Sequence, residues 1–268
     1  MPKYRQTLAN CHNDLGLLLT ELGQRAEAAA AYRQALVVRE VLARDYPTVP
    51  ENRQELAISH NNLGNLLQDL GQRTEAAAAY RQALVLQEAL ARDYPTVPEY
   101  RQELAISHHN LGGLLLGLGQ WGEAATAYRQ ALALLEALVR EFPTVPSYHQ
   151  TLAGNYVNFG LLVLKQGKSA EALTWFAQAI PLLEGLLRQE PRDATSRQYL
   201  CSAHWGRAST LTDLGRFAEA VAEWNLTLLY NDAAQDTASI KQDRAATVRM
   251  AALYQDYAWP LLWGWPRW

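Results

Sequence analysis

The sequence lacks several features that would point to a membrane, a nucleic acid or secretion. No apolar run reaches the roughly twenty residues that a helix needs to span a bilayer. No dense run of Lys or Arg supplies the basic stripe that nucleic acids require, and the formal net charge is −3. The amino terminus has no secretory-signal pattern. These absences predict a cytoplasmic protein that binds no nucleic acid and has no membrane span.

What the sequence does contain is a repeat with a period of 48 residues. Successive blocks begin near residues 5, 53, 101, 149 and 197, and a glycine marks the same point in each, at Gly23, Gly71, Gly119, Gly167 and Gly215. A fixed period of this size is typical of a solenoid, in which each unit buries its apolar face against its neighbours. We therefore expect a repeat array over residues 1–231.

Each block has the pattern of two amphipathic helices. In the second block one helix face collects Leu56, His60, Leu63, Leu67 and Leu70, at steps of four and three. A glycine turn follows, and a second helix face then collects Ala76, Tyr80, Ala83 and Leu90. This second helix is expected to end before Pro95. No segment has a strand signal, so the fold class is predicted to be all-α.

Two further signals concern where helices begin and where the array ends. Thr48 and Glu51, like Thr96 and Glu99, have the spacing of a capping box at the start of the next helix. After the array, residues 232–268 are expected to form a cap: a helix over 236–257 with Ile240, Val248 and Leu253 facing inward, followed by a Trp-rich tail. Pro260 and Pro266 argue against helix in that tail. The tail is expected to cap the last hairpin, to dock a partner or to be poorly ordered.

The paired helices resemble the tetratricopeptide repeat. That family places a small residue where its two helices cross, and this site is filled by Gly16, Gly64, Gly112, Gly160 and Ala208. The family's alanine and aromatic residue of the second helix are matched by Ala76 and Tyr80 and by their equivalents in the other blocks. The unit is about fourteen residues longer than the standard one. In this it resembles arrays C-terminal to planctomycete-type bacterial serine/threonine kinases.

The resemblance implies a right-handed α-solenoid of five long hairpins, whose first helices line a concave groove that holds an extended peptide. By this resemblance the groove residues are Asn13, Asn61, Asn62, Asn65, His109, Asn110, Asn158, Leu161 and Trp205. Asparagine has a donor and an acceptor, so a column of asparagines suits a peptide backbone. The alternative is that these asparagines are solvated or bridge neighbouring helices.

The later groove positions have a different character. Val157, Leu161, Leu164 and Trp205 are apolar and suit a hydrophobic anchor residue of a partner. Lys165 is the one basic residue at a groove position, which disfavours capture of a carboxylate.

No set of residues indicates catalysis, a cofactor or a metal. The glycine pattern of residues 117–122 falls on a turn after a helix, which is the wrong context for binding phosphate. His12, His60, His108 and His204 occur once per block, too far apart to share one zinc ion, so they are interpreted as packing residues. Cys11 and Cys201 are expected to be unpaired thiols, as in a reducing compartment.

The sequence therefore predicts a non-catalytic protein-interaction scaffold. Two alternatives remain open: a structural protein that self-assembles through weak end stacking, and a detached regulatory array of a bacterial serine/threonine kinase.

Overall fold

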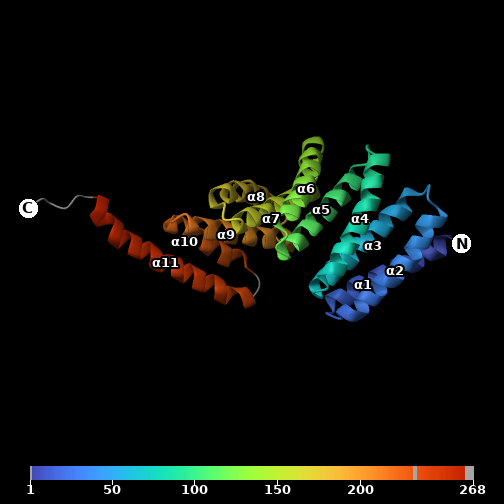
Figure 1. Cartoon of the computed structure of the whole chain (residues 1–268), viewed down its shortest axis with the longest axis horizontal. Helices are drawn as coiled ribbons and strands as arrows, with labels where there is room; N and C mark the ends of the chain where they lie inside the picture. The colour runs from blue at the N-terminus through green and yellow to red at the C-terminus, as the bar shows by residue number, and fades with distance from the viewer. Residues whose placement is uncertain (1, 232–233, 263–268) are drawn as a thin grey trace, which may run out of the picture. The chain divides into compact units, whose positions relative to one another are not determined.

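The computed structural model describes the backbone of residues 2–231 and 234–262, and the side chains of residues 2–231 and 237–252. The described residues form helices and turns and contain no strand, as predicted (Figure 1). The helices are α1 (Pro2–Glu21), α2 (Arg25–Asp45), α3 (Pro50–Asp69), α4 (Arg73–Asp93), α5 (Pro98–Gly117), α6 (Trp121–Glu141), α7 (Pro146–Lys165), α8 (Ser169–Gln189), α9 (Ala194–Asp213), α10 (Phe217–Tyr230) and α11 (Ala234–Leu262).

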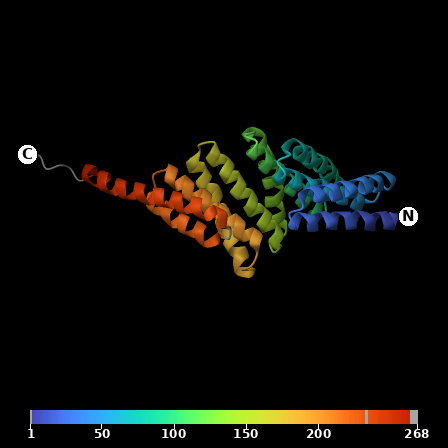
Figure 2. The same ribbon diagram turned by 90° about the horizontal axis from the view of Figure 1, so that it is seen from below.

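Consecutive helices pair as hairpins, which confirms the repeat solenoid. In one compact unit, residues 1–143, the hairpins are α1–α2, α3–α4 and α5–α6; in the second, residues 144–268, they are α7–α8 and α9–α10, followed by α11. Figure 2 shows α1 and α2 side by side, as Figure 1 does. The division between the two units falls within the array of residues 1–231. Each unit is described separately below.

The glycine at the tip of each hairpin has a left-handed backbone, as the sequence predicts. The φ angles of Gly23, Gly71, Gly119, Gly167 and Gly215 lie between 72° and 75°. In the second hairpin the N–H of Gly71 donates to the carbonyl of Gln68 at 3.0 Å and closes the end of α3. Residues with a Cβ are strained at such φ values, so glycine at this point ends the first helix and starts the turn.

A second glycine in each of the first four hairpins lets the two helices cross closely. A Cβ added to Gly64 would lie 2.6 Å from the ring of Tyr80, and one added to Gly112 would lie 2.7 Å from the ring of Tyr128. Both tyrosine rings are buried. The core of the hairpin is therefore built around an aromatic ring of the second helix that packs directly on the backbone of the first.

The predicted capping boxes are wrong. The residue that caps α3 is Val49, one position after Thr48, and no side chain caps this helix. Val97 and Val145 take the same place before α5 and α7. A proline follows each valine as the first helical residue, and because proline has no N–H, one of the donors that a cap would satisfy is absent.

The end of the array is partly as expected. α10 stops at Tyr230, seven residues shorter than α8, and Ile240 of α11 is buried. Val248 is instead 40% exposed, because the buried face of α11 runs through Ile240 and Thr247. The prediction that proline excludes helix is wrong at Pro260, since α11 continues to Leu262; one lost backbone bond near the end of a 29-residue helix is tolerated. The side chain of Leu253, and Pro266, lie outside the described residues.

Candidate interaction surface

The first helices of the three hairpins in unit 1 share an exposed face. Four positions of each helix, related by the repeat, lie on it: Thr7, Asn10, Asp14 and Leu17 of α1; Glu55, Ile58, Asn62 and Asn65 of α3; Glu103, Ile106, Asn110 and Gly113 of α5. Steps of three and four residues place each set along one side of its helix. We call these twelve residues the A-helix face, and all of them are exposed or half-buried.

The predicted asparagines divide into an outer and an inner group. Asn62 and Asn110 are half-buried members of the A-helix face, whereas Asn13 and Asn61 are buried. Asn61 donates from Nδ2 to Oγ of Ser107 at 2.5 Å and thereby joins α3 to α5. The inner group therefore bridges neighbouring hairpins, which is the alternative that the sequence left open.

Asn62 is joined to α1 and still has an acceptor to offer. Its Nδ2 donates to Oδ1 of Asn13 at 3.2 Å, which leaves its own side-chain carbonyl for another partner. Asn65 is exposed, and its Oδ1 accepts from the hydroxyl of Tyr80 at 2.7 Å, which leaves its NH₂ group. His109 is buried, with its ring edge-on to Tyr128 at 5.9 Å between centroids, so it packs inside the hairpin.

The A-helix face carries negative charge. Asp14, Glu55 and Glu103 lie on it, and none of its twelve positions is Lys or Arg. The carboxylate of Glu55 meets Nη2 of the buried Arg39 at 2.6 Å, whereas Glu103 has glutamine at the position equivalent to Arg39. Burial raises the pKa of Glu103, and the charge of Glu55 raises it further. Sequence reasoning missed Arg39; its signal was that it breaks the repeat.

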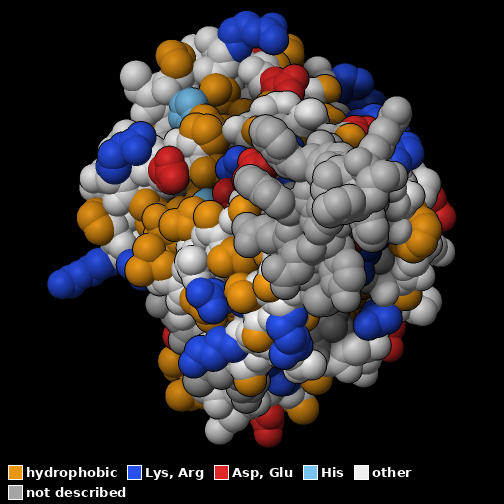
Figure 3. All heavy atoms as spheres, turned by 90° about the vertical axis from the view of Figure 1, so that its left-hand side faces the viewer, with side chains coloured by type: hydrophobic (Ala, Val, Ile, Leu, Met, Phe, Trp, Pro, Cys, Tyr) orange, Lys and Arg blue, Asp and Glu red, His pale blue; other side chains and the backbone are white. Residues whose placement is uncertain are grey.

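In unit 2 two predicted residues line one pocket. The pocket has a volume of about 300 Å³ and is lined by Leu161, Cys201, Ser202, Trp205, Thr227, Asn231, Ser239 and Ile240. Trp205 is 38% exposed and stands edge-on to Trp224, with the ring centroids 6.5 Å apart. Figure 3 shows apolar side chains gathered on the left of the face that it draws.

The remaining predicted positions of unit 2 differ among themselves. Asn158 is half-buried and stands at the position of Asn62 and Asn110. The prediction for Val157 is wrong: this residue is fully buried and lines no surface. Val157 stands at the repeat position of Asn13 and Asn61, and these two residues are buried in unit 1 as well.

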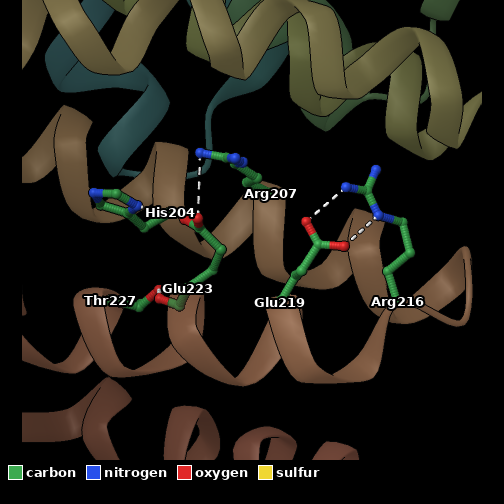
Figure 4. Close-up of polar contacts among 6 residues, drawn as sticks. All are labelled: His204, Arg207, Arg216, Glu219, Glu223 and Thr227. Carbon is green, nitrogen blue, oxygen red and sulfur yellow. Dashed lines mark hydrogen bonds and ion pairs between the residues drawn. The ribbon is translucent and has the colours of Figure 1, made fainter.

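The histidine column is built into the hairpins. His204 is buried, its Nδ1 lies 2.7 Å from Oε2 of Glu223, and Arg207 Nη1 lies 3.2 Å from the other oxygen of that carboxylate (Figure 4). His204 also stacks on the ring of Tyr230. Burial lowers the pKa of His60, and it lowers that of His108 to about 4, so both rings are neutral near pH 7. These contacts are those of packing residues.

The described residues contain no group of three or more His, Cys, Asp or Glu side chains placed to hold a metal ion. In the same part of the chain no helix is long and apolar enough to cross a membrane. Cys11 and Cys201 form no disulfide, and the thiol of Cys201 lies 3.6 Å from the backbone carbonyl oxygen of Thr227. The glycine pattern of residues 117–122 spans the end of α5, a turn at Gly119 and the start of α6.

Comparison with known proteins identifies the repeat. Two models of the tetratricopeptide repeat match well over half of the chain, one at residues 8–44, 56–92 and 104–143 and the other at residues 164–236. No curated protein matches the sequence.

Several solved structures have a similar fold. BtubC (BKLC) from P. vanneervenii is 18% identical, with a TM-score of 0.61 over 100% of this chain and 87% of that one. A Podosopora anserina putative kinesin light chain with nearly identical TPR-like repeats is 18% identical, with a TM-score of 0.53 over 86% and 96%. Pseudomonas aeruginosa pilF is 19% identical, with a TM-score of 0.53 over 96% and 95%. Identities this low establish the fold alone.

Proposed function

The chain belongs to the tetratricopeptide repeat family, and on that premise we propose that it is a non-catalytic scaffold whose A-helix face binds an extended segment of another protein. Repeats of this family generally mediate protein–protein interaction. The observation that carries the proposal is the row of surface amides on α3 and α5 of unit 1: Asn65 is exposed, and Asn62 and Asn110 are half-buried. A link to a kinase remains a prediction.

The spacing of the row suits a polypeptide backbone. Packed helices lie about 8–10 Å apart. An extended chain advances about 3.3 Å per residue, so a segment of several residues can cross from α3 to α5, which are joined by the hydrogen bond between Asn61 and Ser107. The side-chain carbonyl of Asn62 and the NH₂ group of Asn65 supply an acceptor and a donor, which together match a peptide unit.

The charge of the face indicates the kind of segment. Asp14, Glu55 and Glu103 lie beside the amides, and none of the twelve positions of the face is basic. The charge of Glu55 is paired with the buried Arg39, so the negative charge that a ligand would meet comes from Asp14 and Glu103. Ile58 and Ile106 lie between the glutamates and the asparagines and give the row an apolar floor. We therefore expect the bound segment to be basic, with aliphatic side chains interspersed, and its affinity to fall as salt is added.

The pocket of unit 2 suits a bulky apolar side chain. Leu161 and Trp205 line it, and its volume of about 300 Å³ is at the lower end of the range for ligand pockets. An aromatic or aliphatic anchor of a partner fits such a site. Replacement of Trp205 by Ala is expected to weaken capture of hydrophobic peptides, whereas Trp121→Ala, at an exposed tryptophan of unit 1, leaves it unchanged.

The proposal is tested by removing two amides of the row. The double variant Asn62→Ala/Asn110→Ala is compared with the parent in binding to a library of basic extended peptides. Loss of two hydrogen bonds is expected to weaken binding about tenfold or more. The matched control is Gln34→Ala/Gln82→Ala, which removes two exposed amides from α2 and α4. Unchanged peptide capture by a fully helical Asn62/Asn110 variant would remove the asparagines from the mechanism.

A further inference from the structure

Helix α1 carries a second apolar row, on a different side from the A-helix face. It consists of Tyr4, Leu8, Cys11, Leu15, Leu18 and Leu22, which follow one another at steps of four and three. All six side chains are exposed, and none is charged. We call this set the outer stripe. We propose that two copies of this chain pair through it, α1 against α1.

The repeat shows what a stripe of this kind does inside the stack. Leu8 is 49% exposed, whereas its equivalent Leu56 is 7% exposed. Leu18 is 52% exposed, whereas its equivalent Leu66 is 2% exposed. α3 packs against α2 and α5 packs against α4, and these junctions bury the equivalents of the stripe from Tyr4 to Leu18. The equivalents of Leu22, which are Leu70 and Leu118, remain exposed. The outer stripe is thus a hairpin-to-hairpin interface that nothing in unit 1 covers.

The stripe is too continuous to be ordinary surface. Exposed apolar residues scattered singly are normal, but a contiguous row along a helix marks an interaction site. Within unit 1, α1 packs extensively only against α2 among the described helices. Val37 and Val85 are also exposed, on α2 and α4, but they stand outside the stripe. They therefore provide matched controls.

The partner that fits is a second copy of the same surface. Head-to-tail stacking would require the corresponding face of the last hairpin, but α11 packs on α10: Ile240 of α11 joins the apolar cluster around Trp224, and Trp224 Nε1 donates to Thr247 Oγ1 at 3.2 Å. A contact between two identical faces closes after two copies and leaves no open end. This distinguishes the proposed pair from the end-stacked filament.

The spacing of the stripe makes it self-complementary. Its steps of four, three, four, three and four read the same in either direction, so two antiparallel copies match about a two-fold axis beside residue 13. Leu8 then lies opposite Leu18 of the other copy, and Cys11 lies opposite Leu15. A pair of leucine rows in this register buries apolar surface on both copies and brings no charge from the stripe into the interface.

Mass measurement over a hundredfold concentration series tests the pairing. The parent mass is expected to rise from one chain toward two, and Leu8→Glu/Leu18→Glu is expected to stay at one chain. Val37→Glu/Val85→Glu should behave as the parent does. A parent that stays at one chain throughout, or a stripe variant that pairs as the parent does, would overturn the proposal.

A cross-link tests the register. In a Cys201→Ser background, Leu15→Cys places a thiol opposite Cys11 of the second copy, so mild oxidation is expected to give a covalent dimer. Val37→Cys in the same background is the control. Equal cross-linking of the two variants, or a ladder of larger species, would contradict an α1–α1 pair. Peptide binding by the A-helix face is scored separately, so either proposal can fail alone.

Discussion

Two junctions between neighbouring hairpins in unit 1 solve the same packing problem with different polar residues. At the junction of α2 with α3, the guanidinium of Arg39 is 3% exposed. It meets the carboxylate of Glu55 at 2.6 Å and the backbone carbonyl of the same residue at 3.0 Å. It also donates to Oδ1 of Asn10 at 3.0 Å and to the hydroxyl of Ser59. This junction contains a buried, paired charge.

The junction of α4 with α5 has no buried guanidinium at the equivalent position. Gln87 stands at the position of Arg39 and accepts a hydrogen bond from Ser107. Ile58 stands at the position of Asn10, and Glu103 at the position of Glu55. The apolar columns of the two junctions are otherwise alike. The comparison therefore indicates that apolar packing carries the stacking, whereas the polar column distinguishes one junction from the next.

Replacing Arg39 should reveal the largest difference. Arg39→Met leaves Glu55 without its partner, and loss of one member of a buried pair costs about 3–5 kcal/mol in general. Because a third of the Glu55 side chain is exposed and can rehydrate, we expect a loss of about 2–3 kcal/mol in the free energy of unfolding. Gln87→Met should cost about 1 kcal/mol. Urea unfolding measures both, and equal losses would erase the distinction between the junctions.

Substitutions at the helix crossing should lower the stability of the second and third hairpins by similar amounts. Gly64→Ala and Gly112→Ala would each push a Cβ into a buried tyrosine ring, and we expect each to lower the free energy of unfolding by about 1–3 kcal/mol. A Cβ added to the neighbouring Gly113 would lie 3.6 Å from the hydroxyl oxygen of Tyr128, which is an ordinary contact distance. Gly113→Ala should therefore stabilise α5 by about 0.5–1 kcal/mol. Thermal unfolding compares the three; a stabilising Gly112→Ala would mean that the helices do not cross this closely.

The two glutamates should respond to substitution with opposite signs. The pKa of Glu103 is raised by burial and by Glu55, so its ionised form is disfavoured in the folded state. Glu103→Gln should therefore be more stable than the parent at pH 7, and this gain should disappear as the pH falls below the unfolded pKa of about 4.3. Glu55→Gln should be less stable than the parent at pH 7, because it removes the partner of Arg39. Chemical unfolding at pH 4 and pH 7 checks both signs.

The smallest effect is expected at the ion pairs that join the start and the end of each hairpin of unit 1. Arg101 binds both oxygens of Glu141, at 2.8 and 2.7 Å, whereas Arg53 contacts Asp93 through one nitrogen at 3.1 Å. Arg101 lowers the pKa of Glu141, so this contact stabilises the fold above the unfolded pKa and is lost as the pH falls. Arg101→Gln should lower the melting temperature slightly more than Arg53→Gln at pH 7, and by the same amount at low pH.

The repeated part of the fold could be predicted because the same residue types recur at equivalent positions of successive blocks. Gly71 and Tyr80 were assigned correctly, since a turn glycine and a core aromatic recur at fixed intervals. The start of α3 was misplaced by one residue, because Thr48 has cap chemistry but Pro50 sets the first helical position. The prediction that Val248 faces inward is wrong for a different reason. α11 lies outside the repeat, so no equivalent helix in another block shows which of its sides is buried.

The candidate site was harder to predict than the fold. Asn61 and Asn62 are adjacent in sequence, yet one is buried and the other is half-exposed. A step of one residue turns a helix by about 100°, and the spacing alone did not decide which asparagine faces outward. The repeat pattern does not predict the role of Arg39, because the equivalent positions hold Gln87, Leu135 and Leu183; this departure is the signal that sets Arg39 apart. Leu161 and Trp205 line one pocket together with Ile240 of α11, a helix that lies outside the repeat, so the repeat pattern does not predict the pocket.

The left-handed glycine turns give the array a set of interchangeable labelling points. Gln72 and Gln120 follow Gly71 and Gly119, are exposed, and make no capping hydrogen bond through their side chains. In a chain with both native thiols replaced by serine, a fluorophore attached to a cysteine introduced at either point would report on one hairpin without touching the A-helix face or the outer stripe. Melting curves recorded from each reporter would then show whether neighbouring hairpins come apart together or one at a time.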